Sequence, residues 1–139
     1  MKYIDATNMV YGRLSSVVAK DLLAGESVKI VNAEKCVITG SKPFILNHFK
    51  ERREIGSVRK GPHYPRTPDQ ILRRSIKNML PSKKTTGKEA LKRCRVYCGV
   101  PADLKGMQFE TIDKAMNKKL SNYLTLSEIS LSLGYKVKN

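Results

Sequence analysis

The first 31 residues contain a strand, a helix and a second strand in close succession, and this pattern restricts the fold more than any other feature of the chain. Residues 3–6 are typical of a short strand, and residues 12–23 place apolar side chains on one face of a helix. Gly25 ends this helix, and residues 27–31 form the second strand. Strands joined by a helix run parallel with a right-handed crossover. We therefore predict that the N-terminal third belongs to the α/β class.

The same patterns predict two more strands and another helix. Residues 36–39 are typical of a third strand, but only residues 32–35 separate it from the second. That connection is too short for a helical crossover, so the direction of the third strand stays open. Residues 43–53 are predicted to form a helix. Residues 95–98 are typical of a fourth strand, which would complete the sheet.

A basic helix is predicted in the middle of the chain. Thr67 is its expected N-cap, with Pro68 at the first helical position and Gln70 able to reach back to the cap. Pro81 ends the helix. The apolar face comprises Leu72, Ile76, Met79 and Leu80, and the basic face comprises Arg73, Arg74 and Lys77.

A second basic helix is predicted directly after the first. Thr86 and Glu89 have the spacing of a capping box at its start. Its apolar side comprises Ala90, Leu91 and Cys94, and its basic side comprises Lys88, Lys92 and Arg95. Thr125 and Glu128 have the same spacing and predict a third capped helix near the end of the chain.

Positive charge is concentrated in these two predicted basic helices and in the residues just before them. The chain has a formal net charge of +15, and residues 42–95 hold 16 Lys or Arg against 4 Asp or Glu. Rows of like charge weaken a helix by roughly a few tenths of a kcal/mol per pair, and a bound polyanion would remove that cost. A solvated basic face is the simpler interpretation of one row, but the total charge favours a phosphate-binding surface. Composition alone allows DNA, messenger RNA or an acidic protein equally.

The sequence lacks the signals of export and membrane insertion. No apolar run reaches the roughly 18 to 20 residues of a membrane span, and the start has no apolar signal segment. We therefore expect a cytosolic protein. An odd number of cysteines, Cys36, Cys94 and Cys98, suits reduced buried thiols better than a disulfide framework.

Motifs for catalysis, cofactors and metals are weak. The glycine-rich loop of a dinucleotide site is missing after the first strand, where Gly12 stands alone, and residues 86–89 lack the upstream glycine and the hydroxyl residue of a P-loop. Cys94 and Cys98 lie four apart without a second ligand pair. His63 fits a loop histidine near an anion better than a catalytic base. We predict no enzyme activity, no cofactor and no metal.

Three segments resemble, in the same order, the ribosomal protein L13 family (uL13) of the large ribosomal subunit. They are IDATNMVYGRLSSVVAKDLL (4–23), VKIVNAEKCVITG (28–40) and RRSIKNMLPSKKTTGKEALKRCRVYCGVP (73–101). The segment RKGPHYPRTPDQILRRSIKNMLP is similar to the archaeal and eukaryotic form. The long C-terminal extension of eukaryotic members and the longer bacterial lead-in to the second strand are both missing. The archaeal type fits best.

This resemblance implies a fold and a function. The fold would be a three-layer α/β/α domain around a small, mostly parallel four-stranded sheet, one L13-like domain over residues 1–139 with a basic loop at about residues 55–68. The function would be a structural component of the large subunit that binds large-subunit ribosomal RNA, lies beside other large-subunit proteins and supports subunit assembly. A free-standing RNA-binding translational regulator is the alternative. The corresponding RNA-binding positions are Arg59, Lys60, Arg66, Arg73, Arg74, Lys77, Lys83, Lys84, Lys88 and Lys92.

Overall fold

The predicted strand, helix and strand at the start of the chain are confirmed in the computed structural model, which describes residues 1–57, 59–119 and 121–135. Strand β1 spans Lys2–Asp5, helix α1 Tyr11–Leu23 and strand β2 Val28–Val31. β1 and β2 are parallel, with Lys2 opposite Val28. The predicted fourth strand is also present as β4, Cys94–Val96, and pairs in parallel with the other edge of β2. The first sheet therefore has the order β1-β2-β4.

The third predicted strand does not join this sheet. Strand β3, Val37–Thr39, pairs antiparallel with a strand that the sequence did not predict, β5, Tyr123–Thr125. The connection after β2 forms a short 3-10 helix, η1, Ala33–Lys35, which leads the chain away from the parallel sheet. The α/β class and the mostly parallel sheet are confirmed, and the arrangement is consistent with three layers. The strand count differs, because the sheet has three strands and the other two form a separate pair.

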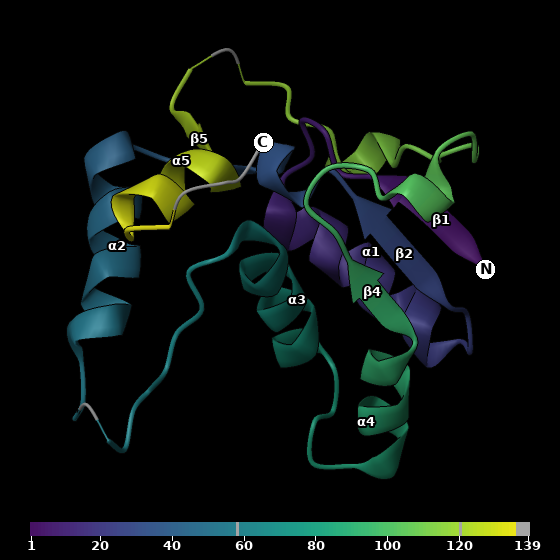
Figure 1. Cartoon of the computed structure of the whole chain (residues 1–139), viewed down its shortest axis with the longest axis horizontal. Helices are drawn as coiled ribbons and strands as arrows, with labels where there is room; N and C mark the ends of the chain where they lie inside the picture. Colours follow the sequence, from purple (N-terminus) through teal and green to yellow (C-terminus); the bar gives the residue numbers. More distant parts are fainter. Residues whose placement is uncertain (58, 120, 136–139) are drawn as a thin grey trace.

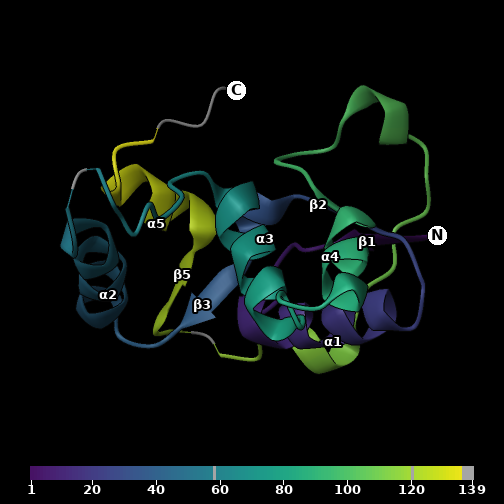
Figure 2. The same cartoon turned by 90° about the horizontal axis from the view of Figure 1, so that it is seen from below.

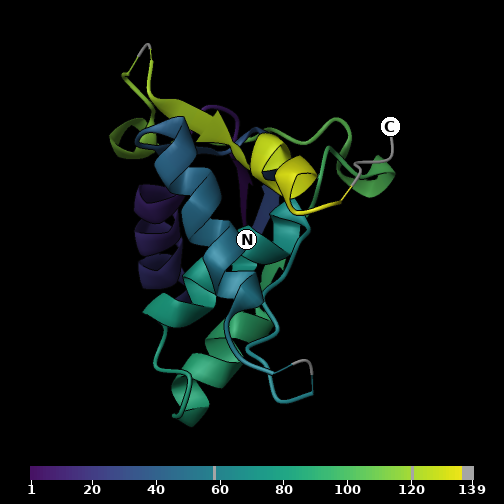
Figure 3. The same cartoon turned by 90° about the vertical axis from the view of Figure 1, so that its left-hand side faces the viewer.

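Four more α-helices surround the two sheets (Figure 1). They are α2 (Lys42–Glu54), α3 (Pro68–Met79), α4 (Thr85–Lys92) and α5 (Leu126–Ser132). Two further 3-10 helices are η2 (Ala102–Leu104) and η3 (Asp113–Ala115). α3 packs against α1 and β4, whereas α2 lies at the side of the molecule away from α4 and faces the viewer in Figure 3. None of the helices in the described ranges is long and apolar enough to cross a membrane.

The core follows the predicted apolar faces with small shifts. Ile76 on α3 is fully buried, as expected, but Met79 is 45% exposed. Ile71, which the predicted face omitted, is buried in its place. The helix therefore presents a slightly rotated face to α1, because packing against a neighbour selects the buried stripe within the range that helical spacing allows.

Two of the three predicted N-cap positions are confirmed, but only one has the predicted side-chain hydrogen bonds. Thr125 and Glu128 form the predicted capping box of α5. Thr67 is the N-cap residue of α3, but its side chain makes no capping hydrogen bond. The box predicted for Thr86 and Glu89 is wrong, since the N-cap of α4 is Lys84, two residues before Thr86. This shift buries Gly87 against Pro81.

The cysteines are reduced, but only two are buried. Cys36 and Cys94 lie in the core, whereas the prediction is wrong for Cys98, which is exposed because the chain leaves the sheet after β4. Burial raises the pKa of the Cys36 thiol to about 12 and that of Cys94 to about 11. These two thiols behave as small core side chains and stay protonated at neutral pH.

Candidate nucleic-acid interface

Tyr64 joins the basic loop to the helices on both sides of it. Arg52 of α2 donates a hydrogen bond from Nη1 to the Tyr64 hydroxyl at 2.8 Å, and Arg53 donates one to the Tyr64 carbonyl oxygen at 2.6 Å. The guanidinium carbon of Arg74, on α3, lies 4.6 Å from the centroid of the Tyr64 ring. Phe49 packs edge-on against the same ring, with centroids 6.2 Å apart. The end of the predicted basic loop is therefore held between α2 and α3 by cation–π and aromatic contacts.

A groove of about 560 Å³ lies between α3, the end of this loop and β4. Its lining residues are His63, Pro65, Asp69, Gln70, Arg73, Arg74, Lys77, Arg95, Val96 and Tyr97. Four of these side chains are cationic and one is a carboxylate, so the groove carries a net positive charge. The groove lies at an edge of the parallel sheet, because β4 is the last strand in the order β1-β2-β4.

Two arginines of the groove each make one long hydrogen bond to the protein. Arg73 Nη2 lies 3.4 Å from the carbonyl oxygen of Leu91, and Arg74 Nη1 lies 3.4 Å from that of His63. These are long hydrogen bonds, and each guanidinium has five N–H donors. Most donors of both arginines are therefore available to an anion that enters the groove.

The structure places only three of the ten predicted RNA-binding residues in this groove, namely Arg73, Arg74 and Lys77. The other seven are exposed and lie along a wider surface. Arg59, Lys60 and Arg66 lie in the loop before α3, Lys83 and Lys84 lie between α3 and α4, and Lys88 and Lys92 lie on α4. In Figure 1 the loop, α3 and α4 all extend toward the lower side of the molecule, and Figure 2 views the chain from that side. Position 58 of the loop lies outside the described residues.

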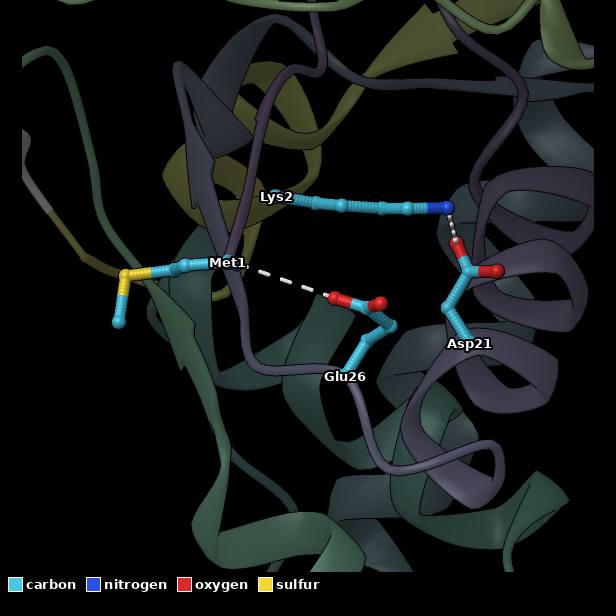
Figure 4. A network of polar contacts seen from close by, with 4 residues as sticks. All are labelled: Met1, Lys2, Asp21 and Glu26. Carbon is cyan, nitrogen blue, oxygen red and sulfur yellow. Dashed lines mark ion pairs between the residues drawn. The ribbon is translucent and has the colours of Figure 1, made fainter.

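The basic surface has no acidic partner within the described ranges of the chain. The ion pairs there join Lys2 Nζ to Asp21 at 3.2 Å and the Met1 amino group to Glu26 at 3.8 Å, both beside β1 (Figure 4). None of the ten predicted residues is paired with a carboxylate in those ranges. Mutual repulsion on this surface is therefore not relieved inside the fold.

Sequence reasoning missed part of this arrangement and misplaced another part. Arg95 was expected to extend the basic row of the second helix, but it lies on β4 and lines the groove instead. The predicted strand at residues 95–98 also includes Arg95, and the structure confirms the strand and not the helical row. Arg93, between α4 and β4, has a structural contact, since its Nη2 donates to the carbonyl oxygen of Leu22 at 2.6 Å near the end of α1. No signal in the sequence indicated Tyr64, because its partners lie on two separate helices.

The described residues do not form a metal cluster, since no group of three or more His, Cys, Asp or Glu side chains gathers in those ranges. His63 lines the groove beside cations, the position expected of a loop histidine near an anion. The chemistry that this arrangement supports is the binding of phosphate groups by guanidinium and ammonium groups.

The comparison with known proteins agrees with this geometry. The family model for ribosomal protein L13 matches residues 1–103. The chain belongs to the ribosomal protein L13 family. Relatives named large ribosomal subunit protein uL13 include one from Picrophilus torridus, which is 61% identical over 96% of this chain and 97% of its own length. Another, from Thermoplasma volcanium, is 58% identical over 96% and 98%. A third, from Archaeoglobus fulgidus, is 46% identical over 96% and 87%.

These matches confirm the resemblance to the archaeal type, since all three sources are archaea. Proteins of the L13 family are structural components of the ribosome and not enzymes. This agrees with the prediction of no enzyme activity, which was based on the missing catalytic motifs. The match ends at residue 103, so it covers the groove, both basic helices and the loop between α2 and α3.

Proposed function

We propose that this chain is a structural component of the large ribosomal subunit that binds large-subunit ribosomal RNA and supports assembly of the subunit in the cytoplasm. Its RNA-binding surface comprises Arg59, Lys60, Arg66, Arg73, Arg74, Lys77, Lys83, Lys84, Lys88 and Lys92. Other large-subunit proteins would lie beside it. The whole chain acts as one L13-like domain in this role.

One observation carries the proposal: the predicted basic residues are accessible and have no carboxylate partner in the described ranges. An RNA backbone supplies a phosphate for each such side chain and releases counterions. Relief of the repulsion between the basic side chains therefore contributes to the free energy of binding. Membership of a ribosomal family makes ribosomal RNA the polyanion that fits.

Sedimentation of ribosomes through sucrose at high salt tests this role. We expect the protein to travel with large subunits. A variant in which Lys83, Lys84, Lys88 and Lys92 are all replaced by Gln should be lost from them, because four phosphate contacts disappear. The matched control replaces Lys20, Lys105, Lys114 and Lys119 with Gln, which removes the same charge from exposed positions outside the proposed surface.

The control should remain with the large subunits. Equal loss of both variants would mean that net charge alone drives the association. Recovery of the wild-type protein mainly in free fractions would contradict a structural role and favour the free-standing RNA-binding regulator.

A further inference from the structure

The groove between α3 and β4 combines a defined hollow, cationic side chains and ring side chains, whereas the rest of the basic surface offers exposed charges. A phosphate backbone lying across a surface needs only the charges. We propose that the groove binds a single unpaired nucleotide of RNA. This inference rests on the RNA-binding function proposed above and names the part of the RNA that this site takes.

The size of the groove suits a nucleotide. Its volume of about 560 Å³ is within the range of about 300 to 1,000 Å³ that is typical of sites for small molecules and cofactors. An RNA duplex is wider than such a site and is bound through its shape and backbone, whereas unstacked bases can enter pockets. The hollow therefore favours a nucleotide that has left its helix.

Charge is distributed unevenly along the groove. Asp69 and Gln70 lie in the first turn of α3, and Lys77 lies in its last turn. Arg73 and Arg74 lie between them, and Arg95 faces the groove from β4. A phosphate is favoured at the cationic end and repelled by the Asp69 carboxylate. The carboxylate and amide at the other end can instead hydrogen-bond to the edge of a base.

The walls of the groove offer surfaces for a base. Tyr97 and His63 contribute rings, and arginine guanidinium planes stack on bases in the same way. β4 is the last strand of the sheet in the described ranges, so one of its edges has no strand partner there. Backbone N–H and C=O groups on a free edge can pair with a base edge.

An acidic peptide is the other ligand that a basic groove beside a free strand edge could attract. The carboxylate of Asp69 disfavours it, because acidic side chains along the groove would meet a like charge. A nucleotide has a charged phosphate at one end and a neutral base at the other, so it matches the cationic end and the Asp69 end of the groove. We therefore assign the groove to a nucleotide.

Titration of the ¹⁵N-labelled full chain with adenosine monophosphate, followed by NMR, tests the site. We expect the backbone amide signals of residues 69–77 and 95–97 to shift. Arg95→Gln should weaken this binding by roughly tenfold, since one charge-assisted contact to the phosphate is lost. Lys92→Gln is the matched control, because Lys92 is exposed on α4 and does not line the groove. It should bind the nucleotide like the wild type.

Tyr97→Leu provides a second variant that keeps an apolar side chain but removes the ring. We expect it to weaken adenosine monophosphate and leave inorganic phosphate unchanged. Its thermal unfolding should be measured in parallel, and Arg95→Gln alone is sufficient for the test if Tyr97→Leu does not fold. Signals that shift outside the groove, inorganic phosphate binding as tightly as the nucleotide, or an oligoglutamate peptide displacing it would each overturn the proposal.

The same proteins separate failure of this site from failure of the proposed function. If wild type binds ribosomal RNA with a steep salt dependence and Lys92→Gln weakens it, but adenosine monophosphate does not bind in the groove, only the nucleotide site is wrong. If wild type does not bind ribosomal RNA, the function is wrong as well.

Discussion

Gly87 is required by a close tertiary contact, although helix propensity would favour another residue at this position. It lies inside α4 and is buried, and a Cβ atom there would lie 2.1 Å from the carbonyl oxygen of Pro81. Glycine is normally unfavourable within a helix by about 1 kcal/mol relative to alanine. Here it allows the backbone of α4 to approach the preceding turn closely.

Gly87→Ala should therefore lower the free energy of unfolding by about 1–3 kcal/mol, as overpacking does, despite the better helix propensity of alanine. Gly12 in α1 is the matched control, because nothing lies within 4 Å of a Cβ atom there. Gly12→Ala should raise the same quantity by up to about 1 kcal/mol. Urea unfolding of both variants measures this, and stabilisation by Gly87→Ala would contradict the close contact.

Tyr64 is the residue at which α2, the basic loop and α3 meet. Tyr64→Leu should lower the free energy of unfolding by about 1–3 kcal/mol, because it removes two cation–π contacts and the edge-on contact with Phe49. Tyr64→Phe should cost less than about 1 kcal/mol, since it removes only the exposed hydrogen bond from Arg52. Chemical unfolding compares the two, and equal losses would show that the ring contributes nothing.

The buried thiols make stability depend on alkaline pH. The ordinary thiol pKa is 9.0, and burial raises it to about 12 for Cys36 and about 11 for Cys94. Above pH 9 the unfolded chain binds fewer protons than the folded chain, so the free energy of unfolding should fall as pH rises toward 11. The slope should be on the order of 1 kcal/mol per thiol and pH unit. Below pH 9 these groups should have no effect.

Thermal unfolding from pH 8 to pH 10.5 checks this dependence. The double variant Cys36→Ala and Cys94→Ala should be less stable at pH 8 but should show a shallower fall at higher pH. The pKa of Cys98 is also raised, to about 11, so Cys98→Ala should lessen the fall by the contribution of one thiol. Identical slopes in all three proteins would mean that other groups cause the fall.

At the scale of elements, two helix starts with the same residue type differ in their hydrogen bonds. The Thr125 side chain accepts a hydrogen bond from the Glu128 amide at 3.4 Å. Thr67 also occupies an N-cap position, but its hydroxyl is buried and has no partner among the described residues. A cap position therefore does not ensure a cap bond, because tertiary contacts set the rotamer.

Replacing each threonine should reveal this difference. Thr67→Val keeps the shape and removes the unpaired hydroxyl, so it should raise the free energy of unfolding by about 1 kcal/mol. Thr125→Ala removes a working cap and should lower it by about 1 kcal/mol. Urea unfolding measures both changes, and a loss of similar size at Thr67 would mean that its hydroxyl has a partner in solution.

At the scale of the whole molecule, the core and the basic surface use opposite sides of the same helix. Ile76 of α3 is fully buried, whereas Lys77 beside it is exposed and unpaired in the described ranges. Stability and RNA binding should therefore be separable by neighbouring substitutions.

We expect the affinity for ribosomal RNA to fall steeply with salt, with a slope of log K against log salt of about −4 or steeper for roughly six contacts. Lys77→Ala should reduce the magnitude of this slope by about 1 and change stability by less than about 0.5 kcal/mol. Ile76→Ala should lower stability by about 2–5 kcal/mol and leave the slope unchanged under folding conditions. RNA titrations at several salt concentrations, with unfolding curves, test this, and a wild-type slope near −2 would contradict the extended surface.

The sequence was sufficient for features that depend on near neighbours along the chain. The parallel unit of β1, α1 and β2, the basic helix that begins at Pro68 and the capping box at Thr125 all follow from spacing within a few residues. The concentration of charge in residues 42–95 is also a property of the sequence, and with the family resemblance it led to the ten proposed RNA-binding positions.

Features that join distant segments required the tertiary structure. β3 and β5 are more than eighty residues apart. The sequence predicted β3 but not β5, and neither short strand identifies its partner from its own residues. The groove likewise combines α3 with Arg95 and Tyr97 of the later strand region, and Tyr64 combines two helices. Local patterns limit which face of an element can be buried, but packing between elements selects the partner and the rotation. For that reason Ile71 replaced Met79 in the core, and Arg95 lines the groove instead of extending the basic row of α4.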